Sequence, residues 1–266
     1  MELVLSLFPG IDVFGRGFQQ LGFCVVRGPD TLLDDPIEDW SCAIPTSKID
    51  GVIAGPPCQN FSDANRHRAR AEGVRLLQEC LRCIWECRPN WFVIENVRNV
   101  PDVALPGYHV QRLDLIDVEC GGHQRRLRHI QFGSLNGDVI RPIRTPSTRS
   151  VTAKTVLCRP RSQHDRPVRR AAAQGVGGLR LRSLTSAARS RVIGNAVPLA
   201  IARSLAAAVS LRSPIESSDC ECLCGRRVTG KARFATPACR KRAERRRRDT
   251  GSDRVTWLQP STRSPS

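Results

Sequence analysis

The segment Asp50-Gly-Val-Ile-Ala-Gly-Pro-Pro-Cys-Gln-Asn-Phe-Ser62 joins a short apolar run to a stiff loop. Val52–Ala54 predicts a buried strand of a parallel sheet, and Gly55-Pro56-Pro57 ends that strand. Cys58 therefore follows the carboxyl end of a strand, where open α/β sheets bind their ligands. Because the two prolines restrict the loop, the thiol is held in place. Such a cysteine is a candidate nucleophile, although a Pro-Cys pair in a loop is more often structural.

A second apolar run, Trp91-Phe-Val-Ile-Glu-Asn-Val97, predicts another buried strand, and this one ends in a carboxylate. A glutamate at such a position loses hydration unless it has a partner or a chemical role. Strands that lie side by side in a parallel sheet end at the same edge. We therefore expect Cys58 and Glu95 to face one pocket.

These two segments resemble motifs of the DNA (cytosine-5)-methyltransferase family. Three further blocks follow the order of that family: Leu5-Ser-Leu-Phe-Pro-Gly10, Gln124-Arg-Arg-Leu-Arg128 and Gly194-Asn-Ala-Val-Pro198. The chain looks most like the short members carried by phages and prophages, whose relatives belong to restriction-modification systems. The resemblance implies an α/β fold with a doubly wound, Rossmann-like sheet that binds S-adenosylmethionine.

For the reaction, the resemblance implies methyl transfer from S-adenosylmethionine to C5 of a cytosine flipped out of double-stranded DNA. Cys58 would add to C6 of the base, and Glu95 would act at N3. Arg128 would hold the flipped base, Arg126 would support the loop, and Gln124 completes the same block. The alternative is a non-enzymatic, DNA-binding remnant of the same fold. The intact Cys58, Glu95 and Gln124 block favours the enzyme, whereas Pro36 and the Arg-rich interval within residues 134–193 favour the remnant.

The resemblance also assigns residues to the cofactor. Phe8 would lie on the adenine, the Gly10 backbone near the methionine part, and Asp30 at the ribose hydroxyls. Asn195 and Val197 would contact the methionine part. The full set expected at the cofactor is Phe8, Gly10, Ile11, Asp30, Ile37, Pro57, Leu76, Asn195 and Val197. The sequence departs from the family twice: Asp12-Val13 replaces paired glycines, and Pro36 replaces an acid.

Charge and composition favour a nucleic acid partner. The 266 residues carry a net charge of +17, of which residues 220–266 hold +9, with 13 Lys/Arg against 4 Asp/Glu. Such a density of positive charge favours a polyanion, although a solvated basic surface explains the tail as well. The scattered cysteines, and the lack of an apolar leader or of an apolar run of membrane-spanning length, predict a reducing cytoplasm. The chain is also expected to be a monomer.

The chain divides into a large domain and a small basic appendage. Residues 1–211 are expected to form the methyltransferase domain, with strands near residues 2–7, 23–26, 52–54, 91–97, 108–117 and 127–133 and helices near 13–21, 73–87 and 194–211. Residues 134–193 are a shortened target-recognition interval with little periodicity, either poorly ordered or altered by a disturbed reading frame. Residues 212–219 form a linker, and 249–266 a disordered tail.

Residues 220–248 combine four thiols with a basic helix expected at Arg240–Arg248. Cys220, Cys222, Cys224 and Cys239 can bind one zinc ion tetrahedrally, and the glycine after the third cysteine permits a tight turn. The C-x-C spacing differs from the common C-x-x-C pairs. An unstructured basic tail is therefore the alternative to a zinc knuckle.

Overall fold

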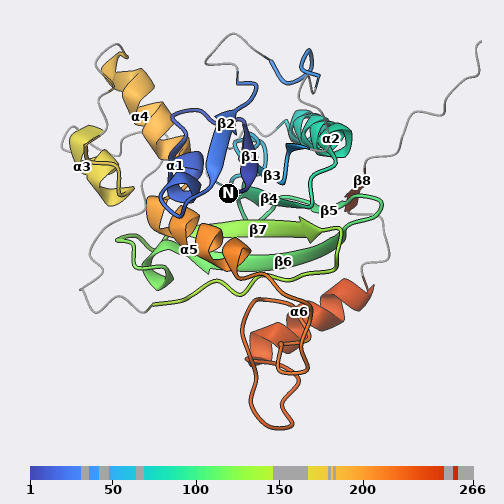
Figure 1. Ribbon diagram of the computed structural model, residues 1–266. Helices are drawn as coiled ribbons and strands as arrows, with labels where there is room; N and C mark the ends of the chain where they lie inside the picture. The colour runs from blue at the N-terminus through green and yellow to red at the C-terminus, as the bar shows by residue number, and fades with distance from the viewer. Residues whose placement is uncertain are drawn as a thin grey trace, which may run out of the picture.

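The computed structural model describes residues 1–30, 36–41, 48–63, 69–145, 167–178, 181, 184–248 and 254–256. At its centre lies a six-stranded sheet with the order β2-β1-β3-β4-β7-β6 (Figure 1). The strands are β1 (Leu3–Leu7), β2 (Cys24–Arg27), β3 (Gly51–Ala54), β4 (Trp91–Asn96), β6 (His109–Ile116) and β7 (Leu127–Ser134). The first four are mutually parallel, whereas β7 runs antiparallel to both β4 and β6.

The strand order reverses between β1 and β3, so the connections after these two strands leave the sheet in opposite directions. Leu7 pairs with Ala54, which brings the ends of both strands together. A crevice outside the carboxyl ends is the usual result of such a reversal. The expected doubly wound α/β fold is therefore confirmed, with an antiparallel β7–β6 edge added to the parallel strands.

Helices cover both faces of the sheet. α1 (Val13–Gln19) and α5 (Leu199–Ser210) lie on one side in Figure 1, and α2 (Arg70–Cys87) lies on the other. Phe18 of α1 and Leu205 of α5 belong to a buried cluster with Trp91 of the sheet, and Leu81 of α2 belongs to a second cluster. The helix periodicity of the sequence arises from these apolar faces, which must be buried against the sheet.

The interval before α5 contains regular structure that the sequence did not indicate. α3 (Pro167–Ala173) and α4 (Ser186–Asn195) pack together through buried residues that include Ala171 and Val192. The helix that the Gly194–Pro198 block was expected to open begins at Leu199, directly after Pro198, whereas Gly194 and Asn195 are the last residues of α4. Residues 146–166 of this interval lie outside the described residues.

One stretch, Ser186–Ser210, is long and apolar enough to cross a membrane, contrary to our reading of the sequence. It is formed by α4 and α5 with a break at Ala196–Pro198, and 67% of its most apolar window is buried inside the protein. Since α5 packs along α1 and contributes to the central core, this is the pattern of a core helix.

The C-terminal part forms two features. A cysteine module, which we define as residues 216–248, contains the four expected thiols and α6 (Pro237–Arg248), the predicted basic helix with an earlier start. Beyond it, β8 (Arg254–Thr256) pairs in parallel with β5 (Asp102–Ala104), and Val255 packs into the α2 cluster. A short strand thus occurs within residues expected to be disordered; residues 249–253 and 257–266 lie outside the described residues.

Candidate active site

A cavity of about 490 Å³ opens at the carboxyl ends of β1, β3 and β4. Eleven of the residues expected at the site line it: Phe8, Gly10, Ile11, Asp30, Ile37, Pro57, Cys58, Leu76, Glu95, Arg128 and Asn195. They come from strand ends, α2, β7 and α4, so the fold alone brings them together. The volume lies in the range typical of cofactor and substrate pockets.

The loop after β1 forms one wall of this cavity. Phe8 has a positive φ of 54°, which is uncommon for a residue with a side chain, and its N–H donates to the Pro29 carbonyl at 3.2 Å. The Gly10 N–H donates to Oδ2 of Asp30 at 2.6 Å. Asp30 therefore fixes the shape of this loop in addition to lining the cavity.

Asp12, one of the departures from the family pattern, has a clear local role. Its Oδ1 accepts from the Gly15 N–H at 3.0 Å and from the Ser6 hydroxyl at 3.0 Å, so it caps the N-terminus of α1. A Cβ at position 15 would lie 2.5 Å from this oxygen, which leaves room only for glycine. The side chain at position 12 thus stabilises the helix that supports the cofactor loop.

The Cys58 loop is held by the strand that carries Glu95. Asn96 Nδ2 donates to the Pro56 carbonyl at 3.1 Å, and Asn96 Oδ1 accepts from the Val97 N–H at 2.8 Å. Asn96 is 1% exposed, so this link lies inside the protein. Asn96 belongs to the Trp91–Val97 motif, but its sequence context alone indicates no role for it. A polar residue at the end of a fully buried strand was the available signal.

Glu95 is buried and forms an ion pair with Nε of Arg128. Burial raises the pKa of the Glu95 carboxyl above its usual range, although the charges of Arg128 and Arg126 oppose the shift. Both guanidinium groups thus lie close enough to this carboxyl to act on its charge. A carboxyl with a raised pKa is suited to share or donate a proton.

Gln124 and Arg126 lie outside the cavity lining and anchor its surroundings instead. Gln124 is fully buried and donates through Nε2 to the Ala173 carbonyl at 2.7 Å, and Arg126 Nη2 donates to the Gly194 carbonyl at 2.6 Å. The block therefore connects the start of β7 to α3 and to the C-terminal end of α4, which carries Asn195. Val197 also lies outside the lining, because its side chain is buried in the core cluster with Phe18.

Arg191 lines the cavity but was not expected there. It precedes Asn195 by one helical turn in α4, and it forms no ion pair with a described residue. Another lining arginine, Arg75, is engaged at 2.6 Å with Glu38 and also pairs with Glu72. In the sequence, Arg191 stands four residues before Asn195. This spacing places both side chains on one helix face only if a helix includes both residues, as α4 does.

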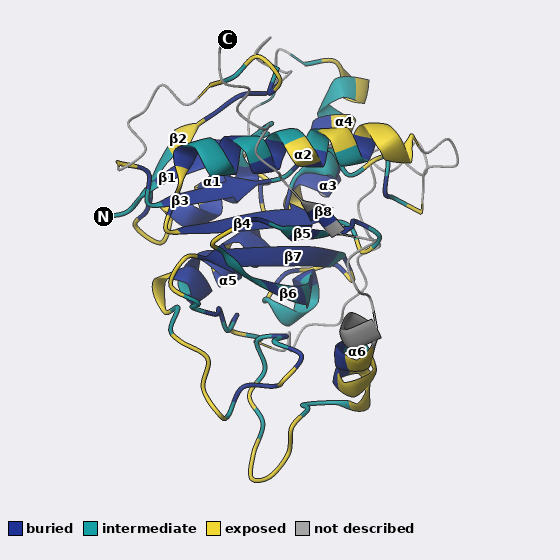
Figure 2. Cartoon of the chain, turned by 90° about the vertical axis from the view of Figure 1, so that its right-hand side faces the viewer, coloured by how far each residue is buried: buried dark blue, intermediate teal, exposed yellow. Residues whose placement is uncertain are grey.

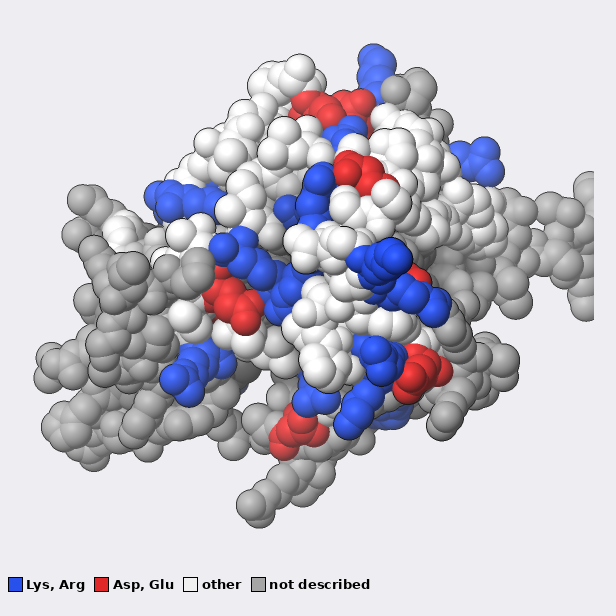
Figure 3. All heavy atoms as spheres, turned by 90° about the horizontal axis from the view of Figure 1, so that it is seen from below, with Lys and Arg blue, Asp and Glu red and all other residues white. Residues whose placement is uncertain are grey.

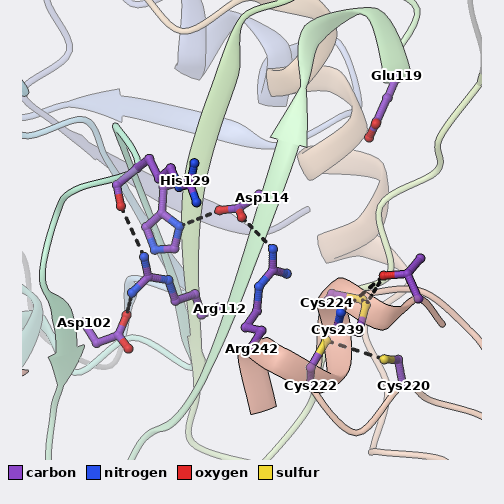
Figure 4. Close-up of polar contacts among 12 residues, drawn as sticks. Asp102, Arg112, Asp114, Glu119, His129, Cys220, Cys222, Cys224, Cys239 and Arg242 are labelled. Atoms are coloured by element: carbon purple, nitrogen blue, oxygen red, sulfur yellow. Dashed lines mark hydrogen bonds and ion pairs between the residues drawn. The ribbon is translucent and has the colours of Figure 1, made fainter. Parts of the chain in front are cut away.

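A second group of functional side chains lies in the cysteine module (Figure 4). The sulfur atoms of Cys220, Cys222, Cys224 and Cys239 all lie within 4.8 Å of one another, and all four residues are buried. The Cys220–Cys222 and Cys224–Cys239 sulfur distances are 3.5 and 3.8 Å. Zinc–sulfur bonds of about 2.3 Å in a tetrahedron require sulfur separations of about 3.8 Å. The four thiols can therefore hold one zinc ion.

Comparisons with known proteins identify relatives of this chain. The family model for C-5 cytosine-specific DNA methylases matches residues 30–163, which is half of the chain. The type II methyltransferase M.HgiDI of Herpetosiphon aurantiacus is 24% identical over 51% of this chain and 53% of its own length. The type II methyltransferase M.AgeI of Thalassovita gelatinovora is 26% identical over 52% of this chain and 41% of its own. The chain thus spans about half the length of these relatives.

A solved structure of an E. coli protein, described as a DNA modification methyltransferase encoded within a prophage, has the same fold. It aligns with a TM-score of 0.56 and 14% identity over 79% of this chain and 99% of its own. At that identity the likeness concerns the fold alone, whereas the family model matches the sequence itself. The chain belongs to the C-5 cytosine-specific DNA methylase family.

Proposed function

We propose that this chain is a DNA (cytosine-5)-methyltransferase, which transfers a methyl group from S-adenosylmethionine to C5 of a cytosine in double-stranded DNA. One observation carries the proposal: Cys58 and the Glu95–Arg128 pair open into the same cavity as the Phe8–Gly10 loop and Asn195. A nucleophile, a carboxyl of raised pKa and a cofactor-sized space are therefore contiguous.

The residues of the cavity fit S-adenosylmethionine. Phe8 offers an aromatic face and Asp30 a carboxylate beside the Gly10 backbone, which suits an adenosine. At the other end, Asn195 and Arg191 provide an amide and a positive charge, which suit the carboxylate of the methionine part. The bound cofactor supplies an electrophilic methyl group on a sulfonium.

Cys58 and Glu95 would activate the base. Cytosine C5 is a poor nucleophile until the Cys58 thiolate adds to C6 and shifts electron density toward C5. Glu95 would hydrogen-bond to N3 or protonate it, which stabilises the negative charge that this addition creates. Once C5 carries the methyl group, loss of its proton to a base would restore the C5–C6 double bond, expel the thiolate from C6 and free the enzyme.

A base stacked in a duplex cannot reach either residue, because both lie in a cavity within the fold. The cytosine must therefore leave the helix, as in other enzymes that act on a base. Arg128 lines the cavity and pairs with Glu95, so its guanidinium can orient the carboxyl toward the flipped base. Asn96 would keep Cys58 and Glu95 in register through its contact with Pro56.

The decisive test is trapping at Cys58. Duplexes that contain 5-fluorocytosine should form a covalent complex with the wild type, because a fluorine cannot leave C5 as a proton does. Cys58→Ser should form none and should methylate no DNA, while Cys24→Ser, another half-buried cysteine, should behave as the wild type. If the wild type binds DNA but neither methylates nor traps it, the chain is the non-enzymatic remnant.

We also propose that the cysteine module binds one structural zinc ion. The support is the sulfur geometry, together with the Thr236 hydroxyl that donates to the Cys239 sulfur at 3.1 Å. Metal analysis of the purified protein should give one zinc per chain, and Cys239→Ala should lose it. The matched variant Cys83→Ala, which removes a buried thiol of α2, should keep its zinc. Equal zinc in both variants contradicts the assignment.

A further inference from the structure

We propose that the cysteine module holds the DNA backbone beside the catalytic cavity, through Arg240 and Lys241 on the exposed side of α6. This inference rests on the proposed function, and it assigns the surface that the duplex would contact. Three features support it: the module is docked firmly, it is docked at the catalytic end of the sheet, and it presents cations that the protein itself does not neutralise.

The module is fixed to the edge strand β6 and to the segment that follows β7. Gln111 of β6 is buried and donates through Nε2 to the carbonyls of Leu223 and Ile140, both at 2.9 Å. Arg141 forms an ion pair with Asp219 and donates through Nη1 to the Ser213 hydroxyl at 2.7 Å. These contacts use buried or half-buried groups, so the module has one defined position against the sheet.

That position is at the catalytic end of the sheet. Arg242 of α6 pairs with Asp114 of β6 at 2.8 Å (Figure 4), and Asp114 lies opposite His129 of β7, which lies opposite Asn96 of β4. Arg242 therefore meets the sheet at the level of the residue after Glu95. Two strand spacings, about 10 Å, separate Asp114 from Asn96. In Figure 2, α4, the first turn of α2 and α6 all lie toward the right-hand side.

The charges of the module are only partly compensated by the protein. Arg227 pairs with Glu216 at 3.1 Å, Arg233 pairs with Glu221, and Arg242 pairs with Asp114. Arg240 and Lys241 are exposed, and neither pairs with an acid among the described residues. Seen from below, basic side chains predominate over acidic ones on this face (Figure 3). Uncompensated, adjacent cations favour a polyanion.

A duplex is the polyanion that fits this position. A base inside the cavity leaves its own backbone at the cavity mouth, and successive phosphates of a strand follow every 3.4 Å or so along the axis. Asn96 and Asp114 lie at one level of the sheet and about 10 Å apart across the strands, a distance that corresponds to about three base pairs. The backbone of the bound duplex is then within reach of α6. Contacts with phosphates would add affinity without adding sequence preference.

The test compares two double variants, each of which removes one arginine and one lysine. Arg240→Ala/Lys241→Ala changes the proposed surface. Lys48→Ala/Arg203→Ala changes an exposed Lys and Arg away from the catalytic end of the sheet. Lys48 precedes the first residue of β3, and Arg203 contacts Gln20, which follows the last residue of α1. Binding of a labelled duplex is followed by fluorescence anisotropy at several salt concentrations. The first variant should lose about two units from the slope of log affinity against log salt, and the control much less than one.

Methyl transfer at saturating protein separates the two proposals. If wild-type protein methylates DNA, the Arg240→Ala/Lys241→Ala variant should reach the same single-turnover rate and the same methylated sequence once the duplex is saturated. A wild-type salt slope in that variant, with an unchanged melting temperature, overturns the inference and leaves the methyltransferase proposal intact. A reduced slope in a chain that never methylates DNA supports the surface and contradicts the enzymatic proposal.

Discussion

Asp114→Asn tests how firmly α6 is tied to the sheet. The Asp114 carboxylate accepts from Nδ1 of His129 at 2.9 Å and from Nη2 of Arg242 at 2.8 Å. Burial alone would raise its pKa, but the hydrogen bond from His129 and the positive charges of Arg242 and Arg112 outweigh burial and lower the pKa to about 2. Burial lowers the pKa of His129 itself, so the imidazole is neutral at about pH 7 and donates its Nδ1 proton.

The size of the effect follows from the pKa. A fall from 3.8 to about 2 corresponds to about 2.5 kcal/mol of stability at neutral pH. Since the side chain is 25% exposed, solvent screening reduces this, and we expect about 1–2 kcal/mol. For a domain of this size, that is a fall of roughly 2–8 °C in melting temperature.

The sign of the pH dependence is fixed by the lowered pKa. The contribution of Asp114 is fully present above about pH 4 and is lost as the pH falls toward about 2. The melting temperatures of wild type and Asp114→Asn should therefore differ at about pH 7 and converge in strong acid. Hydrogen exchange of α6 should accelerate in this variant. Asp102→Asn, which removes a similarly exposed carboxylate paired with Arg112 and not with α6, should leave α6 protected. Equal melting temperatures at about pH 7 would refute the reasoning.

Three further substitutions probe the cavity. Glu95→Gln retains the shape but not the acidity of the carboxyl, so single-turnover methylation should slow by ~10²–10⁴; a wild-type rate would make Glu95 structural. Asn96→Ala leaves the Pro56 carbonyl unpaired, which should cost about 1–3 kcal/mol and slow trapping by 5-fluorocytosine while cofactor affinity stays constant. Arg191→Gln should weaken binding of S-adenosylhomocysteine by about tenfold in calorimetry, or about 1.4 kcal/mol, whereas Arg75→Gln, whose guanidinium pairs with Glu38 and Glu72, should weaken it less.

The central sheet was predictable because its signals are local. Gly51–Ala54 and Trp91–Asn96 are buried on both faces and therefore form continuous apolar runs in the sequence. The Gly-Pro-Pro stop after the first run and the polar end of the second mark the carboxyl edge of the sheet. The i, i+4 pattern of α2 is equally local. For these elements the sequence alone was sufficient to place Cys58 and Glu95 at one cavity.

The missed features depend on distant partners. α3 and α4 are rich in Arg, Ala and Gly and have little apolar pattern, and their packing depends on contacts such as Gln124 with Ala173. The short strand β8 has no signal of its own, because only pairing with β5 makes it a strand. Arg191 likewise became a site residue only through the position of α4. The roles of Gln124 and Arg126 as anchors also required the structure, since the sequence gives their spacing but not their partners.

Pairing of β5 with β8 has a consequence for biosynthesis. Ala104 and Thr256 pair although about 150 residues separate them in the sequence, and Val255 completes the α2 side of the core. At 5–20 residues per second, a ribosome that has finished β5 needs about 8–30 s to deliver its partner strand. During that time the apolar surface around Val103 lacks its cover. Nascent chains must therefore remain soluble with this part of the core open, and a stop codon shortly before residue 254 would leave it open permanently.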